Sequence, residues 1–195
     1  MEFRALLPKR RMVRHYAPEP IPRETVERIV ETVRRAPSAG YSQGQRLLVV
    51  MEDEGRAELV RIASRGWAVE DGLEPWLESA AVHIFVCTRE GDYHERYLQE
   101  DKLVDGEEIE WPVPFWWVDI GATMQNIMLA AVNEGLGCGF VGPDIEPLRA
   151  YLGIPDEFVP IGVMPVGRPL PDIRSPSLKR GWVPFDDFAR WERWG

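Results

Sequence analysis

The sequence predicts one globular domain in which helices and a buried sheet occur together. Its 195 residues are enough to bury about 70% of the unfolded chain's surface around a single core. Apolar residues recur at helical spacing over residues 22–36 and 120–133, and continuous apolar runs over residues 46–51, 81–88 and 158–166 are typical of buried strands. The composition, 45% hydrophobic and 28% charged, is that of an ordinary folded protein.

Charge and cysteine content exclude several classes of function. The net charge of −9 repels a phosphate backbone, so no nucleic-acid partner is expected. Cys87 and Cys138 lie far apart and match neither a metal-binding pair nor a disulfide scaffold. No apolar run reaches the roughly 20 residues of a membrane span, and the first residues do not resemble a signal peptide. A cytoplasmic protein without a membrane partner is therefore expected.

The helix predicted over residues 22–36 is bounded by prolines. Pro22 suits the first turn, and Pro37 ends the helix. Shorter helices are expected over residues 54–65 and 143–153. The periodic helix and the strand at residues 46–51 thus flank one loop.

That loop, residues 36–45, reads APSAGYSQGQ and is hereafter called the cofactor loop. Gly40 and Gly44 permit backbone conformations closed to other residues. The loop also offers neutral hydrogen-bonding side chains, namely Ser38, Ser42, Gln43 and Gln45. Such a lining suits a flat ligand with polar edges, although an ordinary helix-to-strand connection has the same composition.

Basic residues are concentrated near the N-terminus, at Lys9, Arg10, Arg11 and Arg14. Guanidinium groups so close together can hold a phosphate or stand beside a developing anion. A solvated surface run or a localisation signal is the alternative. Near the other end, Lys179 and Arg180 form a second basic pair.

The segment 89–117 is irregular. Acidic residues crowd residues 89–110 at spacings that match no calcium loop, which favours a lid, an insertion or a solvated face over a metal site. Three tryptophans follow at Trp111, Trp116 and Trp117, which suit core filling, an interface or a flat-ligand site.

The helix predicted over residues 120–133 is apolar almost all round, so it is expected to be buried against the sheet or a second subunit. Small residues at Gly121 and Ala122 would allow close approach of another helix. After it, residues 136–142 contain three glycines, which either let backbone amides approach a planar ligand or form a helix cap and a turn. His83, alone in an apolar run, is expected to be structural.

The last segment, residues 168–195, is rich in proline, charge and tryptophan. It is too apolar to stay solvated and too irregular to form a core, so it is expected to wrap another surface. The chain contains no Walker loop, Rossmann fingerprint, nucleophile elbow or zinc motif.

Five motifs together resemble the FMN-dependent nitroreductase family in order and separation. They are RRMVR at residues 10–14, APSAGYSQ at 36–43, the helix that contains Gln125 and Asn126, GLGCGFVG at 135–142, and the C-terminal GRP, KR and final aromatic segment. The resemblance covers almost the whole chain. It implies an α+β fold with a mixed central sheet flanked by helices, in an intertwined homodimer with a C-terminal arm and FMN at each interface.

By position, the resemblance also implies which residues bind FMN. Phosphate and ribityl contacts fall on Arg10, Arg11, Met12, Lys179 and Arg180. Arg14 matches the cation beside the pyrimidine edge, where it makes flavin reduction easier and so has the catalytic role. The ring-edge loop, given by the other subunit, falls on Pro37, Ser38, Ala39, Gly40, Tyr41 and Gln43, and the backbone near N5 on Gly139, Phe140, Val141 and Gly142.

The implied activity is hydride transfer from NADH or NADPH through FMN to a small aromatic, nitro or quinone-type acceptor. Alternatives are a flavin-dependent dehalogenase, a flavin-fragmenting enzyme, and a non-catalytic flavin- or deazaflavin-binding protein. Two residues depart from the family pattern: Met12 replaces a hydroxyl residue and Tyr41 an asparagine, so each removes a hydrogen bond to FMN. The tryptophans of residues 111–117 are not general in the family and are interpreted as part of the substrate pocket or dimer interface.

Overall fold

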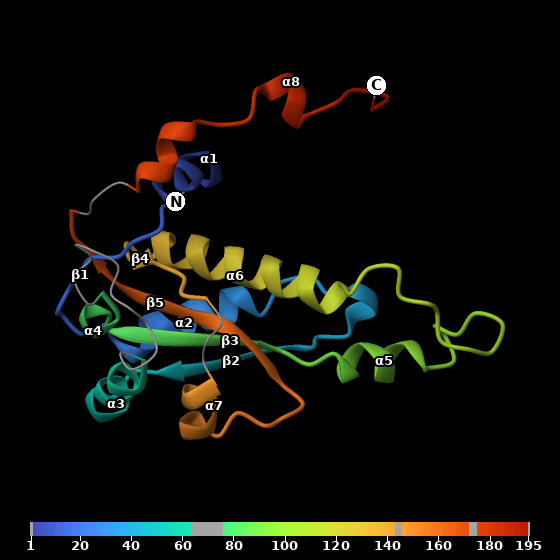
Figure 1. Cartoon of the computed structure of the whole chain (residues 1–195), viewed down its shortest axis with the longest axis horizontal. Coiled ribbons are helices and arrows are strands. Elements are labelled where there is room, and N and C mark those ends of the chain that lie inside the picture. Colours follow the sequence, from blue (N-terminus) through green and yellow to red (C-terminus); the bar gives the residue numbers. More distant parts are fainter. Residues whose placement is uncertain (1, 64–75, 143–145, 172–174, 195) are drawn as a thin grey trace.

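The fold is α+β, with one sheet between two layers of helices (Figure 1). The computed structural model describes residues 2–63, 76–142, 146–171 and 175–194. The arrangement of the sheet and its helices confirms the expected α+β fold.

Five strands form the sheet: β1 (Tyr16–Ala17), β2 (Gln45–Val50), β3 (Val82–Thr88), β4 (Gly137–Cys138) and β5 (Val159–Pro169). Their order is β1-β5-β3-β2, and β4 also pairs with β5. These ladders are antiparallel, whereas the isolated bridge between Met12 and Cys138 is parallel. The long strand β5 therefore links the N-terminal segment to the centre of the sheet.

β5 is continuous, whereas the sequence suggested a strand interrupted by prolines. The β3–β5 ladder absorbs the irregularity in a register shift, because Val86 faces Gly162 while Cys87 faces Pro160. β5 also extends to Pro169, so the first residues of the expected C-terminal arm belong to the sheet.

The alternation of side chains along β3 explains the two helical layers. Ile84 and Val86 pack with α2 (Arg23–Val33) and α6 (Phe115–Asn133) on one face. Phe85 packs on the other face with residues of three helices: α3 (Asp53–Ala63), α4 (Trp76–Ser79) and α7 (Glu146–Leu152). Every residue of β3 is buried, as its unbroken apolar run predicts.

Several helices differ from the expected ranges. α2 ends at Val33 rather than at residue 36, so Pro37 lies beyond its end. α6 begins at Phe115 rather than Ile120, because Pro114 stands at its N-cap and the following aromatic residues continue the helix. The acidic segment contains a helix, α5 (Gly91–Tyr97). The N-terminus forms α1 (Phe3–Leu6) and η1 (Leu7–Lys9), which the sequence did not indicate. Parts of two expected helices, residues 64–65 and 143–145, lie outside the described residues.

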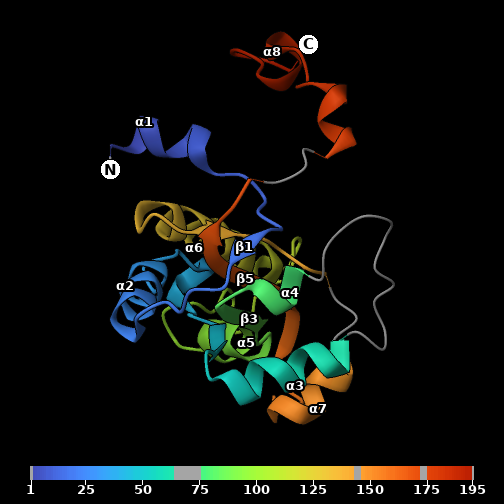
Figure 2. The ribbon, with the colours of Figure 1, turned by 90° about the vertical axis from the view of Figure 1, so that its left-hand side faces the viewer.

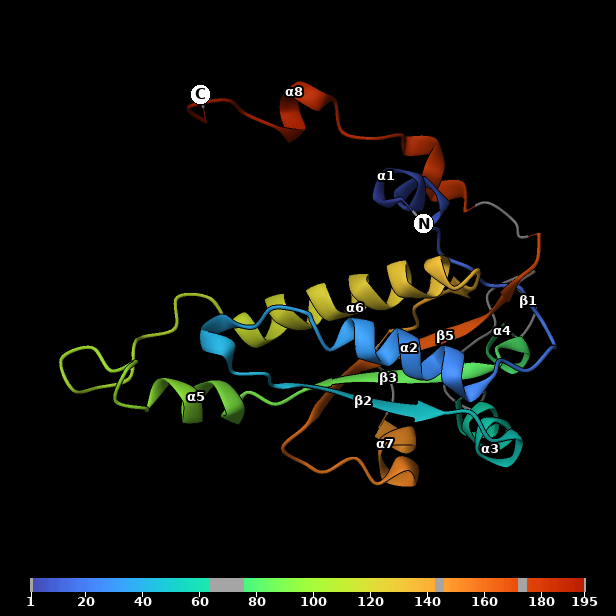
Figure 3. The same cartoon turned by 180° about the vertical axis from the view of Figure 1, so that it is seen from behind.

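The C-terminal segment, which includes η3 (Pro176–Arg180) and α8 (Phe185–Phe188), stands away from the sheet and its helices (Figures 1 and 3). Its large apolar side chains are exposed, Trp182 to 96% and Trp194 to 86%. None of the helices in the described residues is long and apolar enough to cross a membrane.

Candidate functional site

The cofactor loop has an unusual backbone. Gly40, Tyr41 and Gln43 have φ angles of 59°, 61° and 54°, in the left-handed region that costs energy for residues with a side chain. Tyr41 and Gln43 are two of the four non-glycine residues with positive φ in the described part of the chain. Strained backbone of this kind persists only where surrounding contacts hold it, and it is concentrated at functional sites.

Most of the loop's polar side chains close the loop upon itself. The Ser38 hydroxyl accepts from the Gln43 N–H at 2.9 Å, and the Ser42 hydroxyl donates to the Ala39 carbonyl at 2.6 Å. The Gln45 amide donates to the Pro37 carbonyl at 3.1 Å. Three of the neutral groups expected to serve a ligand therefore rigidify the loop, which leaves the exposed side chains of Tyr41 and Gln43 to meet one.

The loop is attached to the start of α6 and to α5. The N–H of Ala39, in η2 (Ala39–Tyr41), donates to Asp119 Oδ2 at 2.8 Å, and the Tyr93 hydroxyl donates to the same oxygen at 2.8 Å. Burial and the bond to Asp119 raise the pKa of Tyr93, which keeps its phenol protonated as a donor. Arg96 Nε donates to the Gly40 carbonyl at 2.9 Å.

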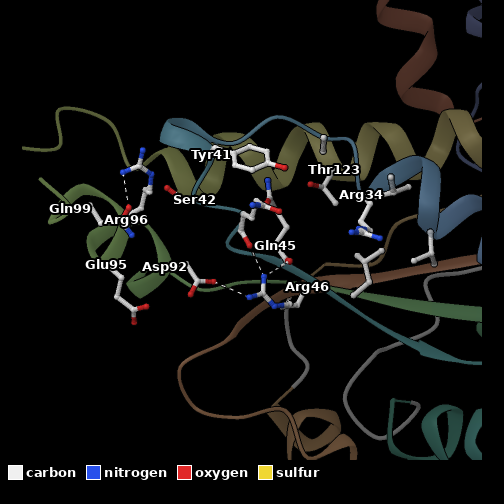
Figure 4. A pocket seen from close by; sticks show the side chains of 15 residues that line it. Arg34, Tyr41, Ser42, Gln45, Arg46, Asp92, Glu95, Arg96, Gln99 and Thr123 are labelled. Carbon is white, nitrogen blue, oxygen red and sulfur yellow. Dashed lines mark hydrogen bonds and ion pairs between the residues drawn. The ribbon is translucent and has the colours of Figure 1, made fainter. Parts of the chain in front are cut away.

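A pocket of about 690 Å³ lies beside the loop. Figure 4 shows Tyr41 and Gln45 on one side of it, with side chains of α5 on another. Its lining mixes cations with carboxylates, among them Arg34, Arg46, Asp92, Glu95 and Arg96. Arg46 and Arg96 are engaged with carboxylates, Arg46 with Asp92 at 3.4 Å. This lining does not favour a strongly anionic group.

The N-terminal cations lie near the opposite end of α6. Arg10 Nη1 is 4.0 Å from Met128 Sδ, and the backbone bridge between Met12 and Cys138 lies beyond the end of that helix. Arg11 donates to the Leu170 carbonyl at 3.0 Å. Arg14 is half-buried within the same segment.

A single chain therefore does not bring the two expected halves of the site together. Along the axis of α6, Asp119 and Met128 are about 13 Å apart at about 1.5 Å per residue, and Arg10 and the loop extend from those two positions. In Figures 1 and 3 the loop lies at the α5 end of α6, whereas β4 and the N-terminal segment lie at the other.

Residues 139–142 run alongside β5. The N–H of Gly139 donates to the Pro165 carbonyl at 3.0 Å, and the N–H of Val141 to the Val163 carbonyl at 2.9 Å. Alternate amides of an extended segment point in opposite directions, so those of Phe140 and Gly142 face away from β5. Of the four residues expected near the flavin, Phe140 and Gly142 are therefore the candidate donors to a ligand.

Lys179 and Arg180 lie in η3, exposed. η3 overlaps α1 in Figure 1, but Figure 2, turned by 90°, shows the two well separated.

The outward face of α6 carries an exposed stripe at helical spacing. Trp117 and Val118 are about half exposed, and Gly121 and Gln125 continue the stripe along the helix. A Cβ atom built on Gly121 would meet nothing within 4 Å. Exposed apolar side chains beside a small residue on one helix face suit close packing against a partner.

Sequence reasoning missed an aromatic cluster that joins α5 to the start of α6. The Trp111 ring lies 4.5 Å from Tyr97 and 5.8 Å from Trp116, and its Nε1 donates to Glu108 at 2.6 Å. His94 Nδ1 lies 2.6 Å from the same carboxylate. The aromatic residues at positions 93, 97, 111 and 116 were visible in the sequence. Their contacts could not be predicted, because an irregular segment separates them and gives no periodic spacing.

This cluster predicts a pH dependence of stability. Burial lowers the pKa of His94, but hydrogen bonds to Glu108 and Glu90 outweigh it, so the folded pKa is raised. The resulting stabilisation is complete below the unfolded pKa of about 6.5 and is lost as the pH rises through the folded pKa. We expect the difference in melting temperature between wild type and His94→Gln to shrink from pH 6 to pH 9, as measured by circular dichroism. If the difference in melting temperature stays constant over this pH range, the ion pairs of His94 with Glu108 and Glu90 do not stabilise the fold.

The other expected structural residues are inert. His83 is fully buried, its Nε2 lies 2.9 Å from the Leu77 carbonyl, and burial lowers its pKa to about 4, so it is neutral. Burial raises the pKa of the unpaired thiols Cys87 and Cys138 to about 11 and about 12. Within the described ranges, no three His, Cys, Asp or Glu side chains are grouped so as to hold a metal ion.

The chain belongs to the nitroreductase family, whose sequence model matches residues 7–168. Solved structures support the same fold. A nitroreductase family protein from Clostridium difficile 630 is 26% identical, with a TM-score of 0.67 over 99% of both chains. A nitroreductase-type protein from Exiguobacterium sibiricum 255-15 in complex with FMN is 20% identical, with a TM-score of 0.73 over 98% of both chains.

The relatives found by sequence are longer proteins, of which this chain matches only a part. An NADPH-dependent oxidoreductase from Staphylococcus epidermidis is 24% identical over 171 residues, which are 84% of this chain. The matched region spans 63% of that relative's length. An NADPH-dependent oxidoreductase from Staphylococcus aureus is 24% identical over 188 residues. The match covers 93% of this chain and 69% of that relative's length.

Proposed function

We propose that this protein is an FMN-dependent oxidoreductase that takes hydride from NADH or NADPH and passes it to a small aromatic, nitro or quinone-type acceptor. Membership of the nitroreductase family supports the reaction class. The FMN complex of one structural neighbour supports the cofactor, and the NADPH-dependent relatives support the reductant. The buried, unpaired thiols are compatible with the cytoplasm.

The observation that carries the proposal is the separation, along α6, of the two elements that we expect to bind FMN: the cofactor loop and the N-terminal cations. A second copy, packed with its α6 antiparallel to the first across the stripe at Trp117, Val118, Gly121 and Gln125, would bring the cofactor loop of one chain toward the N-terminal cations of the other. An isologous homodimer would repeat this arrangement twice. The exposed aromatic residues of the C-terminal arm then have a partner surface to cover.

The groups at the two ends fit FMN. The cofactor loop offers a preset backbone and neutral polar side chains for the edge of a planar ring. The outward amides of Phe140 and Gly142 can donate to ring atoms. The phosphate needs cations, and the N-terminal cluster supplies Arg10 and Arg11. The mixed pocket beside the loop suits a neutral ring better than a phosphate.

Each residue then has a distinct task. Arg10 and Arg11, together with Lys179 and Arg180 of the arm, hold the phosphate. Arg14 places a positive charge at the pyrimidine edge, and the amides of residues 139–142 orient the ring. Bound FMN would supply the hydride chemistry itself, so the site needs no acid–base pair of side chains.

A spectrum of the purified protein tests the proposal. We expect flavin absorbance as purified or on addition of FMN, and oxidation of NAD(P)H when a quinone or nitroaromatic compound is added. Arg10→Ala removes one charged phosphate contact and should weaken FMN binding about tenfold or more, as measured by fluorescence titration. Arg23→Ala, an exposed arginine of α2 paired with Glu27, is the control. A protein that stays colourless with FMN contradicts the function.

A further inference from the structure

We propose that Asp119 is a positioning residue, whose buried carboxylate presets the cofactor loop for FMN by holding the amide of Ala39. The inference rests on the proposed function, because the benefit to binding requires that the loop contact FMN. It assigns a role to a residue of α6 that itself need not touch the cofactor.

Asp119 is well placed for this role. It is 7% exposed, and its Oδ2 accepts two hydrogen bonds of 2.8 Å, from the Ala39 N–H and the Tyr93 hydroxyl. A buried carboxylate needs such donors, since an unsatisfied one is costly. The carboxylate stands on a long helix within the core, and Thr123 bonds to its backbone carbonyl one turn later. The long helix α6 therefore fixes the position of Asp119 Oδ2, the oxygen that accepts the hydrogen bond from the loop.

The remainder of the loop is held by α5. Arg96 Nε donates to the Gly40 carbonyl, and a Cβ atom on Gly40 would come within 2.5 Å of the Tyr97 ring. Gly44 is equally close to the Tyr93 ring, the residue that shares Asp119 with Ala39. The loop is thus pressed against α5 on one side and bonded to α6 on the other.

These contacts compensate for the strain of the loop backbone. Tyr41 and Gln43 occupy a region of φ that residues with a side chain avoid in a free chain. Without the Asp119 bond the loop would populate other conformations, and FMN would have to select the competent one, which lowers the apparent affinity by the fraction lost.

Two variants of Asp119 separate positioning from charge. Asp119→Ala removes both hydrogen bonds and should weaken FMN binding about tenfold or more. Asp119→Asn keeps one oxygen that can accept both bonds, so its affinity should stay within about threefold of wild type. If the asparagine variant loses as much affinity as the alanine variant, charge rather than positioning is responsible, and the inference is wrong.

Hydrogen exchange of the Ala39 amide, measured by NMR without FMN, gives a readout independent of the cofactor. We expect protection in wild type and in Asp119→Asn, and exchange about tenfold or more faster in Asp119→Ala. A merely structural role would lower the melting temperature without changing exchange at Ala39 relative to the neighbouring core amides. That pattern would overturn the inference.

Arg96→Ala is the second test, in case Asp119→Ala does not fold. It removes the bond to the Gly40 carbonyl from a partly exposed position and should weaken FMN binding by a factor of about three to ten, whereas Arg23→Ala should not. Unchanged affinity in both Arg96→Ala and a folded Asp119→Ala contradicts the inference but leaves the proposed function standing. A wild-type protein that does not bind FMN removes the proposed function instead.

Discussion

Gly121→Arg is expected to convert the proposed dimer into folded monomers that no longer bind FMN. In one chain the position is open, because a Cβ atom there would meet nothing within 4 Å, so the monomer fold should tolerate the new side chain. In a close packing of two α6 helices, the same change buries two unpaired cations, at a cost of about 3 kcal/mol or more. Sedimentation velocity gives the oligomeric state, and fluorescence titration gives FMN affinity.

The matched control is Ala150→Arg, which adds the same charge to an exposed position of α7. It should leave both the oligomeric state and FMN affinity unchanged. If Gly121→Arg remains dimeric and binds FMN as wild type does, the α6 stripe is not the interface, and the arrangement proposed for the site is wrong.

Among the glycines that the structure describes, Gly162 is the one where an added methyl group, in Gly162→Ala, is expected to lower stability most. Gly162 has a φ of 154°, and a Cβ atom there would lie 2.3 Å from the Val141 carbonyl oxygen and 2.8 Å from the Phe140 ring. The backbone of β5 must shift away from residues 140–141, which costs about 3 kcal/mol through strain and overpacking. For a chain of this size that corresponds to a fall in melting temperature of about 6 to 12 °C.

Gly142→Ala provides the comparison, because a Cβ atom at Gly142 meets nothing within 4 Å and its backbone needs no positive φ. Its melting temperature should stay within about 2 °C of wild type, since unstrained surface changes have small effects. Equal effects of the two substitutions would show that the contact between β5 and residues 140–141 is not tightly packed.

The regular elements could be predicted because their periods are local. The face of α2 with Val26, Ile29 and Val33 and the buried run of β3 were both recognisable from the sequence alone. The start of α6 was not, since proline and tryptophan in residues 111–117 obscured a helix that Pro114 in fact initiates. The continuity of β5 also escaped prediction, because a register shift that accommodates Pro160 depends on the partner strand.

The candidate site shows the same limit. Gly40 marked the cofactor loop, but the positive φ of Tyr41 and Gln43 is imposed by tertiary contacts rather than by residue type. Asp119 was visible only as a polar interruption in an apolar helix. Its role depends on Ala39 and Tyr93, which are distant in sequence and reach it only in the folded chain.

The division of the site proposed here, between the two ends of α6 in a dimer, has a genetic consequence. A chain with a substitution at Arg10 has a defective phosphate-binding part of the site, whereas a chain with a substitution at Asp119 has a defective loop. In a mixed dimer one site would combine both defects, and the other would be fully wild type. Two inactive alleles of this kind would therefore complement each other, whereas two alleles damaged at the same end of α6 would not.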